Sequence, residues 1–156
     1  MPTGCRTGDP LAGVHHPARI KVLKSCIAVT GTVVSARRNS DGDNKFNLKP
    51  DPGGEHLVNQ RNEAVQGGSL LCEIVPADQP GCVPGQRVAV RLGLMEQVDR
   101  WFKGPYEFGV CTGAAISMPV VGSRVTVVGP LVTDLAHGWN EIHPVWSLTR
   151  VDSPSD

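Results

Sequence analysis

Short runs of β-branched residues, each closed off by glycine or proline, dominate this sequence. The clearest run is Val29-Thr30-Gly31-Thr32-Val33-Val34, and 18 glycines and 13 prolines are spread along the chain. β-Branched residues favour extended backbone, whereas glycine and proline favour turns. The pattern therefore predicts an all-β fold of short strands joined by many turns.

Five strands are expected, at residues 27–38, 45–49, 69–75, 122–133 and 139–151. The first two flank the polar turn Asn39-Ser40-Asp41-Gly42-Asp43 and should form a hairpin. A short helix is expected at 55–66, and a long insertion at about 78–120 is expected to contain another near 94–102. Mid-strand glycines at 31 and 129 allow strong bending. Together these features predict a five-stranded OB-type barrel with one short helix and a long insertion between strands 3 and 4.

The length of 156 residues suits a single domain. We expect an N-terminal extension at 1–25, the barrel at 26–151 and a tail at 152–156. Fifteen basic and fifteen acidic residues cancel, which argues against tight, non-specific binding of nucleic acid. No apolar stretch reaches the roughly 18 residues needed to cross a bilayer, and the first residues lack the apolar segment of a signal peptide. A soluble chain with no membrane partner is expected.

The five cysteines form no Cys-x-x-Cys pair, so a cysteine zinc site is not indicated. Cys72 lies in an apolar run and is expected to be a small buried hydrophobe. Cys82 and Cys111 are expected to form a disulfide, and Cys5 and Cys26 could form another, which leaves one free thiol. A disulfide would favour an exported protein, although the compartment stays open.

The segment from His137 to Trp146 concentrates chemistry-bearing residues: it reads His-Gly-Trp-Asn-Glu-Ile-His-Pro-Val-Trp. With a period of two, Glu141 and His143 share one strand face and Ile142 lies on the other. Two imidazoles and a carboxylate from His137, Glu141 and His143 are a plausible ligand set for zinc or another divalent metal. The alternatives are a structural clasp that ties the loop to the barrel, and a site that recognises a ligand without metal.

Several motifs together resemble a family of uncharacterised bacterial OB-fold proteins, over about residues 13–148. They are Val29-Thr30-Gly31-Thr32-Val33, Asp41-Gly42-Asp43, Glu73-Ile74-Val75-Pro76, the run from Gly122 to Pro130, and Asp134-x-x-His137-Gly138-Trp139-x-Glu141-Ile142-His143-Pro144. The resemblance implies the fold and singles out the last motif, without implying a reaction. Relatives usually carry a histidine two residues after the Asp-Gly-Asp turn, where this chain has Lys45.

The turn at Asp41-Gly42-Asp43 has two interpretations. It is either a polar hairpin turn capped by its own aspartates, or a site for a hard cation held by adjacent carboxylates. The turn also resembles that of staphylococcal-type nucleases, which hold calcium beside a phosphodiester. That likeness implies Asp43 as a ligand and Asp78 as the later carboxylate. The departures are Asn44 in place of a small hydroxyl residue, and the missing arginine and Asp-x-Pro-Glu run.

The remaining candidate site residues are two histidines near the N-terminus and a group of basic and aromatic residues. His15 and His16 precede Pro17, where adjacent side chains point apart, so we expect them to be solvated. Arg37 and Arg38 form the one local basic patch with Lys45 and Lys49. A surface that stacks single-stranded nucleic acid could combine this patch with the aromatic residues Trp101, Phe102, Tyr106 and Trp139. The alternative is a solvated hairpin face beside core aromatics.

Three functions remain open on this evidence. The preferred one is a hydrolase in which Asp43, His137, Glu141 and His143 hold a divalent metal, zinc or calcium, that activates water against a phosphoester or similar bond. The second is a non-catalytic barrel that binds single-stranded nucleic acid or a small polar ligand. The third is an accessory interaction domain. No motif for an organic cofactor is present.

Overall fold

The computed structural model describes residues 1–89, 94–103 and 108–151. Within them, six strands form one sheet in the order β1-β2-β3-β5-β4-β6. The strands are β1 (Ile20–Arg38), β2 (Asn44–Pro50), β3 (Leu70–Ile74), β4 (Arg124–Asp134), β5 (Asn140–Ile142) and β6 (Ser147–Arg150). The prediction of an all-β fold is confirmed.

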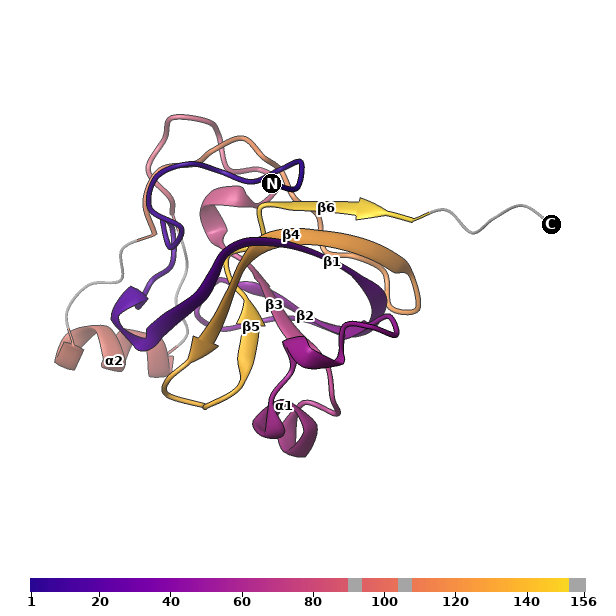
Figure 1. Ribbon diagram of the computed structural model, residues 1–156. Coiled ribbons are helices and arrows are strands. Elements are labelled where there is room, and N and C mark those ends of the chain that lie inside the picture. Colours follow the sequence, from indigo (N-terminus) through magenta and orange to yellow (C-terminus); the bar gives the residue numbers. More distant parts are fainter. Residues whose placement is uncertain (90–93, 104–107, 152–156) are drawn as a thin grey trace.

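Five of these strands close into a ring, because β1 pairs with both β2 and β4. The ring runs β1-β2-β3-β5-β4 and back to β1, with β3 and β5 parallel and every other neighbouring pair antiparallel. Figure 1 shows the long, curved β1 and β4 side by side, with β6 next to β4. The predicted hairpin is the β1–β2 pair, in which Arg38 lies opposite Asn44.

The two mid-strand glycines lie where backbones approach closely. A Cβ at Gly31 would overlap the carbonyl oxygen of Lys49, and one at Gly129 would overlap the carbonyl oxygen of Pro144. Gly31 lies opposite Pro50 on β2 and opposite Val125 on β4. Near this residue β1 changes from pairing with β4 to pairing with β2. Glycine is required there because only a residue without a side chain lets the strands meet.

The helical elements are short. In the described part of the chain they comprise three 3-10 turns, η1 (Pro17–Arg19), η2 (Glu55–Leu57) and η3 (Pro76–Asp78), and two α-helices, α1 (Gln60–Val65) and α2 (Leu94–Lys103). The single helix expected at 55–66 is divided, because Asn59 caps α1 in a reciprocal capping box with Asn62. The buried Asn62 amide also donates to the carbonyls of Ser69 and Asn140, which fastens α1 to the sheet. The helix expected near 94–102 is confirmed as α2.

Two strand boundaries differ from the prediction. β1 begins at Ile20 rather than 27, and its first residues pair with β4 although most of their side chains are exposed, so they carry no apolar pattern. The expected fifth strand is divided into β5 and β6, because Pro144 has no N–H to donate to a ladder. Trp146 resumes pairing by donating its N–H to Val128.

The main core lies inside the ring. Phe46, Leu48 and Leu70 are at zero exposure there, and the other strands contribute residues at most 4% exposed, Val29, Val33, Val125, Val127 and Ile142. A second cluster packs Val14 of the N-terminal segment against Val75 and Ala77 next to η3. This second cluster positions the N-terminal segment beside the end of β3.

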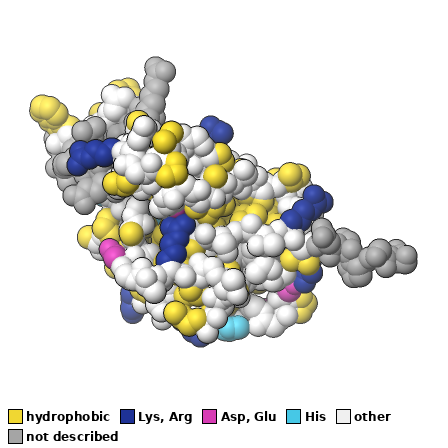
Figure 2. Space-filling view, turned by 90° about the horizontal axis from the view of Figure 1, so that it is seen from above, with side chains coloured by type: hydrophobic (Ala, Val, Ile, Leu, Met, Phe, Trp, Pro, Cys, Tyr) yellow, Lys and Arg dark blue, Asp and Glu magenta, His cyan; other side chains and the backbone are white. Residues whose placement is uncertain are grey.

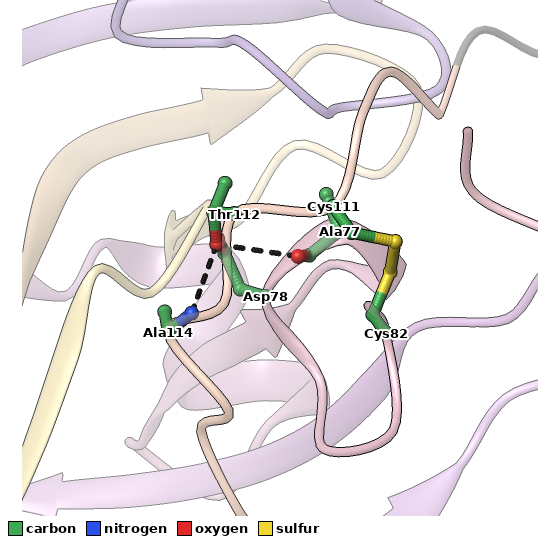
Figure 3. Close-up of a disulfide and its surroundings, with 6 residues drawn as sticks. All are labelled: Ala77, Asp78, Cys82, Cys111, Thr112 and Ala114. Carbon is green, nitrogen blue, oxygen red and sulfur yellow. Dashed lines mark hydrogen bonds between the residues drawn. A yellow bond between two sulfur atoms is a disulfide. The ribbon is translucent and has the colours of Figure 1, made fainter. Parts of the chain in front are cut away.

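Two disulfides fasten the segments outside the ring. Cys5 pairs with Cys26, and Cys82 pairs with Cys111, with Cα separations of 6.0 and 5.3 Å. Cys72 is a free, buried thiol, so the cysteine predictions are confirmed. Figure 3 shows the second disulfide beside Thr112, whose hydroxyl donates to the carbonyl of Ala77 and accepts from the N–H of Ala114. None of the described helices is long and apolar enough to cross a membrane.

Candidate metal centre

Four segments meet at one side of the ring and bring acidic and imidazole side chains together. They are the N-terminal segment at His15, the β1–β2 turn, strand β3 at Glu73, and the residues of β5 and just beyond it. Lys45 lies opposite Glu73 across the β2–β3 pair. Because Glu141 lies opposite Leu71 on the neighbouring strand, the end of β5 reaches the same place.

The two aspartates of the β1–β2 turn lie in different environments. Asp41 accepts a hydrogen bond from the N–H of Asp43 at 3.0 Å, as in a self-capped turn. Gly42 takes a φ of 98°, which favours glycine. Asp43 instead turns its carboxylate into the protein and is 1% exposed. The polar-turn interpretation therefore accounts for Asp41 and leaves Asp43 unexplained.

Asp43 and His143 face each other across the centre. Oδ2 of Asp43 lies 3.7 Å from Nε2 of His143, and both side chains are buried. Among the described residues, neither oxygen of Asp43 has a hydrogen-bond partner, and neither does Nε2 of His143. Burial, reinforced by the charge of Glu73, raises the pKa of Asp43 well above its usual range. Buried polar atoms are nearly always bonded, so this pair is an exception that requires an explanation.

The other ring nitrogen of His143 is held by two carboxylates. Nδ1 lies 2.9 Å from Oε2 of Glu73 and 3.3 Å from Oε1 of Glu141. Burial alone would lower the pKa of His143, but the neighbouring carboxylates outweigh it and raise that pKa well above 6.5. These two carboxylates fix the ring so that Nε2 points at Asp43. A metal-binding histidine is usually oriented in this way through its second nitrogen.

The two glutamates around His143 differ in protonation. Burial would raise the pKa of Glu73, but His143 and Lys45 outweigh it and hold it well below 4.5. Burial, together with the charge of Glu73, raises the pKa of Glu141 to about 8. Trp139 also donates its indole N–H to Oε2 of Glu141 at 2.7 Å. At neutral pH, Glu73 is therefore the charged partner of His143 and Glu141 is mostly a neutral acid.

Lys45 supplies a permanent positive charge at the centre. Its Nζ lies 2.9 Å from Oε1 of Glu73 and 3.8 Å from Oδ2 of Asp41. Burial would lower the pKa of this lysine, but Glu73 and Asp41 outweigh it and raise the pKa above 10.5. Lys45 thus occupies the cluster as a fixed cation.

His15 joins the cluster, which corrects the expectation that it is solvated. Its side chain is 9% exposed, and its Nδ1 and Nε2 lie 3.8 Å from Oδ2 of Asp43 and 3.7 Å from Oδ2 of Asp41. Burial lowers the pKa of His15 to about 4, so the ring is neutral at pH 7. The neighbouring Val14 is buried against Val75, and this anchor carries His15 into the centre.

Two sets of three residues could each hold an ion within the described part of the chain. The first set is Asp43, Glu73 and His143, and the second is His15, Asp41 and Asp43; in each set the ligand atoms lie within 4.8 Å of one another. Of the four ligands expected from the sequence, the structure brings Asp43, Glu141 and His143 together. Asp41 was expected beside Asp43 in the hard-cation interpretation of the turn. Glu73 was missed as a site residue, His15 was expected to be solvated, and Lys45 was assigned to the basic patch. A charged Glu73 within an otherwise apolar run was the one signal that could have found the centre.

His137 lies apart from this set. Its Nδ1 pairs with Oδ2 of Asp134 at 2.7 Å, and its ring stacks on Trp139 with centroids 4.5 Å apart. The tight turn at Gly138 keeps His137 beside its local partner Asp134, so it does not fold back onto Glu141 and His143. Asp78, the carboxylate implied by the nuclease likeness, pairs with Arg6 at 3.0 Å and bonds Thr112, so its charge is already satisfied.

A cavity of about 290 Å³ adjoins the centre. Its lining includes Glu73 and His143 of the centre, and also Arg19, Arg37, His137 and Trp139. Among the proposed ligand-binding residues, Arg38 lines a different cavity with Arg87, and Trp101 is 85% exposed on α2. Tyr106 and the side chain of Phe102 lie outside the described residues. On the face shown in Figure 2, lysines and arginines lie at separate places and form no continuous patch.

No protein-family model and no curated protein matches this chain.

Proposed function

We propose that this protein is a hydrolase that depends on a divalent metal held by Asp43, Glu73 and His143. The observation that carries the proposal is the buried pair of Asp43 and Nε2 of His143, 3.7 Å apart and without hydrogen-bond partners among the described residues. Two ligands of one tetrahedral zinc ion lie about 3.3 Å apart when each bond is about 2.0 Å. A small inward movement of either side chain would therefore close the site around an ion.

The donor set favours zinc or a similar transition metal over calcium. Calcium takes six to eight oxygen ligands, whereas this centre offers imidazole nitrogen together with carboxylate oxygen. A divalent ion would offset the repulsion between Asp43 and Glu73, and it would lower the pKa of a coordinated water toward neutrality. Glu141 would hold Nδ1 of His143 so that Nε2 faces the ion, and Trp139 would hold Glu141.

The cavity beside the centre suggests the class of substrate. Arg19, Arg37 and Lys45 line it together with Asp41, Glu73 and Asp134, so the cavity places cationic groups next to the carboxylates of the centre. Guanidinium groups match the geometry of phosphate oxygens. We propose a phosphoester of low molecular weight as the substrate, since the cavity volume of about 290 Å³ is near the lower end of ligand sites.

The fold proposal is that the closed ring is an OB-type barrel of the resembled bacterial family. The support is the ring order, in which parallel β3 and β5 complete an otherwise antiparallel circuit. The two disulfides support a further proposal, that the protein is exported to an oxidising compartment.

The test is metal binding and hydrolysis by the full, disulfide-bonded protein after treatment with a chelator. We expect Zn²⁺ to bind tightly in calorimetry, and metal to be required for hydrolysis of bis(p-nitrophenyl) phosphate. Asp43→Asn and His143→Gln should abolish tight binding and reduce hydrolysis at least a hundredfold. The control His56→Gln, on the exposed turn η2, should change neither. Unaltered hydrolysis in both site variants, or failure of the unaltered protein to bind Zn²⁺, would refute the proposal.

A further inference from the structure

We infer that a second divalent cation binds beside the first, between His15, Asp41 and Asp43, with the carboxylate of Asp43 bridging the two ions. This inference rests on the proposed function, since it adds to the same centre. It also assigns to the N-terminal segment a part in the site, because His15 lies outside the ring of strands.

The geometry supplies three ligands in one place. Nε2 of His15 lies 3.7 Å from Oδ2 of Asp41, and its Nδ1 lies 3.8 Å from Oδ2 of Asp43. The three residues offer ligand atoms within 4.8 Å of one another. The hydrogen bond from the Asp43 N–H uses Oδ1 of Asp41, whereas Oδ2 faces both His15 and Nζ of Lys45, which is 3.8 Å away.

Asp43 supplies the independent observation that points to a ligand. Its side chain is 1% exposed, and both of its oxygens lack a hydrogen-bond partner among the described residues. A single ion bound through one oxygen would leave the other oxygen unsatisfied. Oδ2 of Asp43 faces both Nε2 of His143 and Nδ1 of His15, so one carboxylate lies between the two positions. Two-metal hydrolytic centres hold their ions about 3.5–4 Å apart.

The positions of the ligands are held by structure outside the centre. The N–H of Asn39 donates to the carbonyl of Asp43 at 2.9 Å, which closes the turn that carries both aspartates. Val14 is 3% exposed in its contact with Val75 and Ala77, and it fixes the backbone next to His15. The second position is therefore formed by two restrained segments that are distant in sequence.

The charges at the centre indicate which ligand completes it. Two divalent ions and Lys45 bring five positive charges, whereas Asp41, Asp43, Glu73 and Glu141 bring at most four negative ones. The surplus is positive, and it faces a cavity lined by Arg19 and Arg37. A phosphate group that contacts both ions would neutralise this surplus, so the second ion and a phosphate should favour each other's binding.

The first measurement is stoichiometry. Metal-free, disulfide-bonded protein is dialysed to equilibrium against Co²⁺, and bound cobalt is counted by elemental analysis. We expect two ions in the unaltered protein, and one in His15→Gln and in Asp41→Asn. The control His56→Gln should keep two. Inorganic phosphate should raise the affinity for the second ion several-fold, and an unchanged affinity would overturn the assignment of phosphate as the completing ligand.

The second measurement reports whether the ions share a bridge. Two Mn²⁺ ions joined by one carboxylate give a spin-coupled electron paramagnetic resonance spectrum, and His15→Gln should convert it to the spectrum of isolated Mn²⁺. One ion in the unaltered protein would overturn the second site while leaving the proposed function intact, and none would overturn both. Two uncoupled ions, or two ions retained in both variants, would show that the second lies elsewhere and would also overturn the inference.

Discussion

The indole of Trp139 supports the centre through one hydrogen bond to Glu141, a residue that is 1% exposed. Trp139→Phe keeps an aromatic ring and removes the donor together with part of the indole. We expect the free energy of unfolding to fall by about 1–3 kcal/mol, because a buried carboxyl oxygen loses its partner. Denaturant titration measures the change. Trp101→Phe is the matched control, since Trp101 is 85% exposed, and an equal loss in both variants would contradict this role of Trp139.

His15 should make the metal-free protein sensitive to acid. Its pKa is about 4 in the folded chain and 6.5 when exposed. Between these pH values the unfolded state binds more protons than the folded state, so the free energy of unfolding falls as pH falls. The loss from pH 7.5 to pH 5 should be about 2 kcal/mol from this residue. In His15→Gln the pH dependence of unfolding should shrink by that amount. Identical pH dependence in the two proteins would contradict the burial of a neutral imidazole.

At the level of single residues, the sequence predicted pairs on one strand better than contacts between segments. The period of two placed Glu141 and His143 on one face, and the structure places their side chains 3.3 Å apart. It could not show that His137 would turn toward Asp134 at the end of β4, because His137 lies in a turn without a fixed period. His15 was missed since its burial depends on Val14 packing against residues about 60 positions away.

Among the elements, β1 depends most on a single position, Gly31. A side chain there would overlap the carbonyl of Lys49 on β2, where the backbone itself would have to move. Gly31→Ala should therefore destabilise the protein by about 1–3 kcal/mol or prevent folding, as overpacking does. Thermal unfolding provides the measurement. Val34→Ala on the same strand, half exposed, should cost much less, and a well-tolerated Gly31→Ala would contradict the close approach.

The strands were predictable where one face is buried and less so where pairing alone defines them. β2 and β3 were found within one residue at each end because apolar residues there fill the core. The first third of β1 was missed because its exposed side chains leave only backbone pairing with β4. The division between β5 and β6 follows from Pro144, a signal that was present in the sequence and was given too little weight.

For the whole molecule, the Cys5–Cys26 disulfide ties the N-terminal segment to β1, and the loop that it closes contains His15. Its sequence separation is 21 residues, for which loop closure predicts about 3 kcal/mol of stabilisation. The double variant Cys5→Ala/Cys26→Ala should lose stability of that order. It should also weaken binding of the second cation far more than binding of the first. Glu73 and His143 lie on or next to strands of the ring, whereas His15 lies in the released loop. Cobalt titration of this variant measures both affinities. Equal weakening of the two ions would mean that the disulfide supports the fold as a whole, and it would contradict a specific role for the N-terminal segment at the centre.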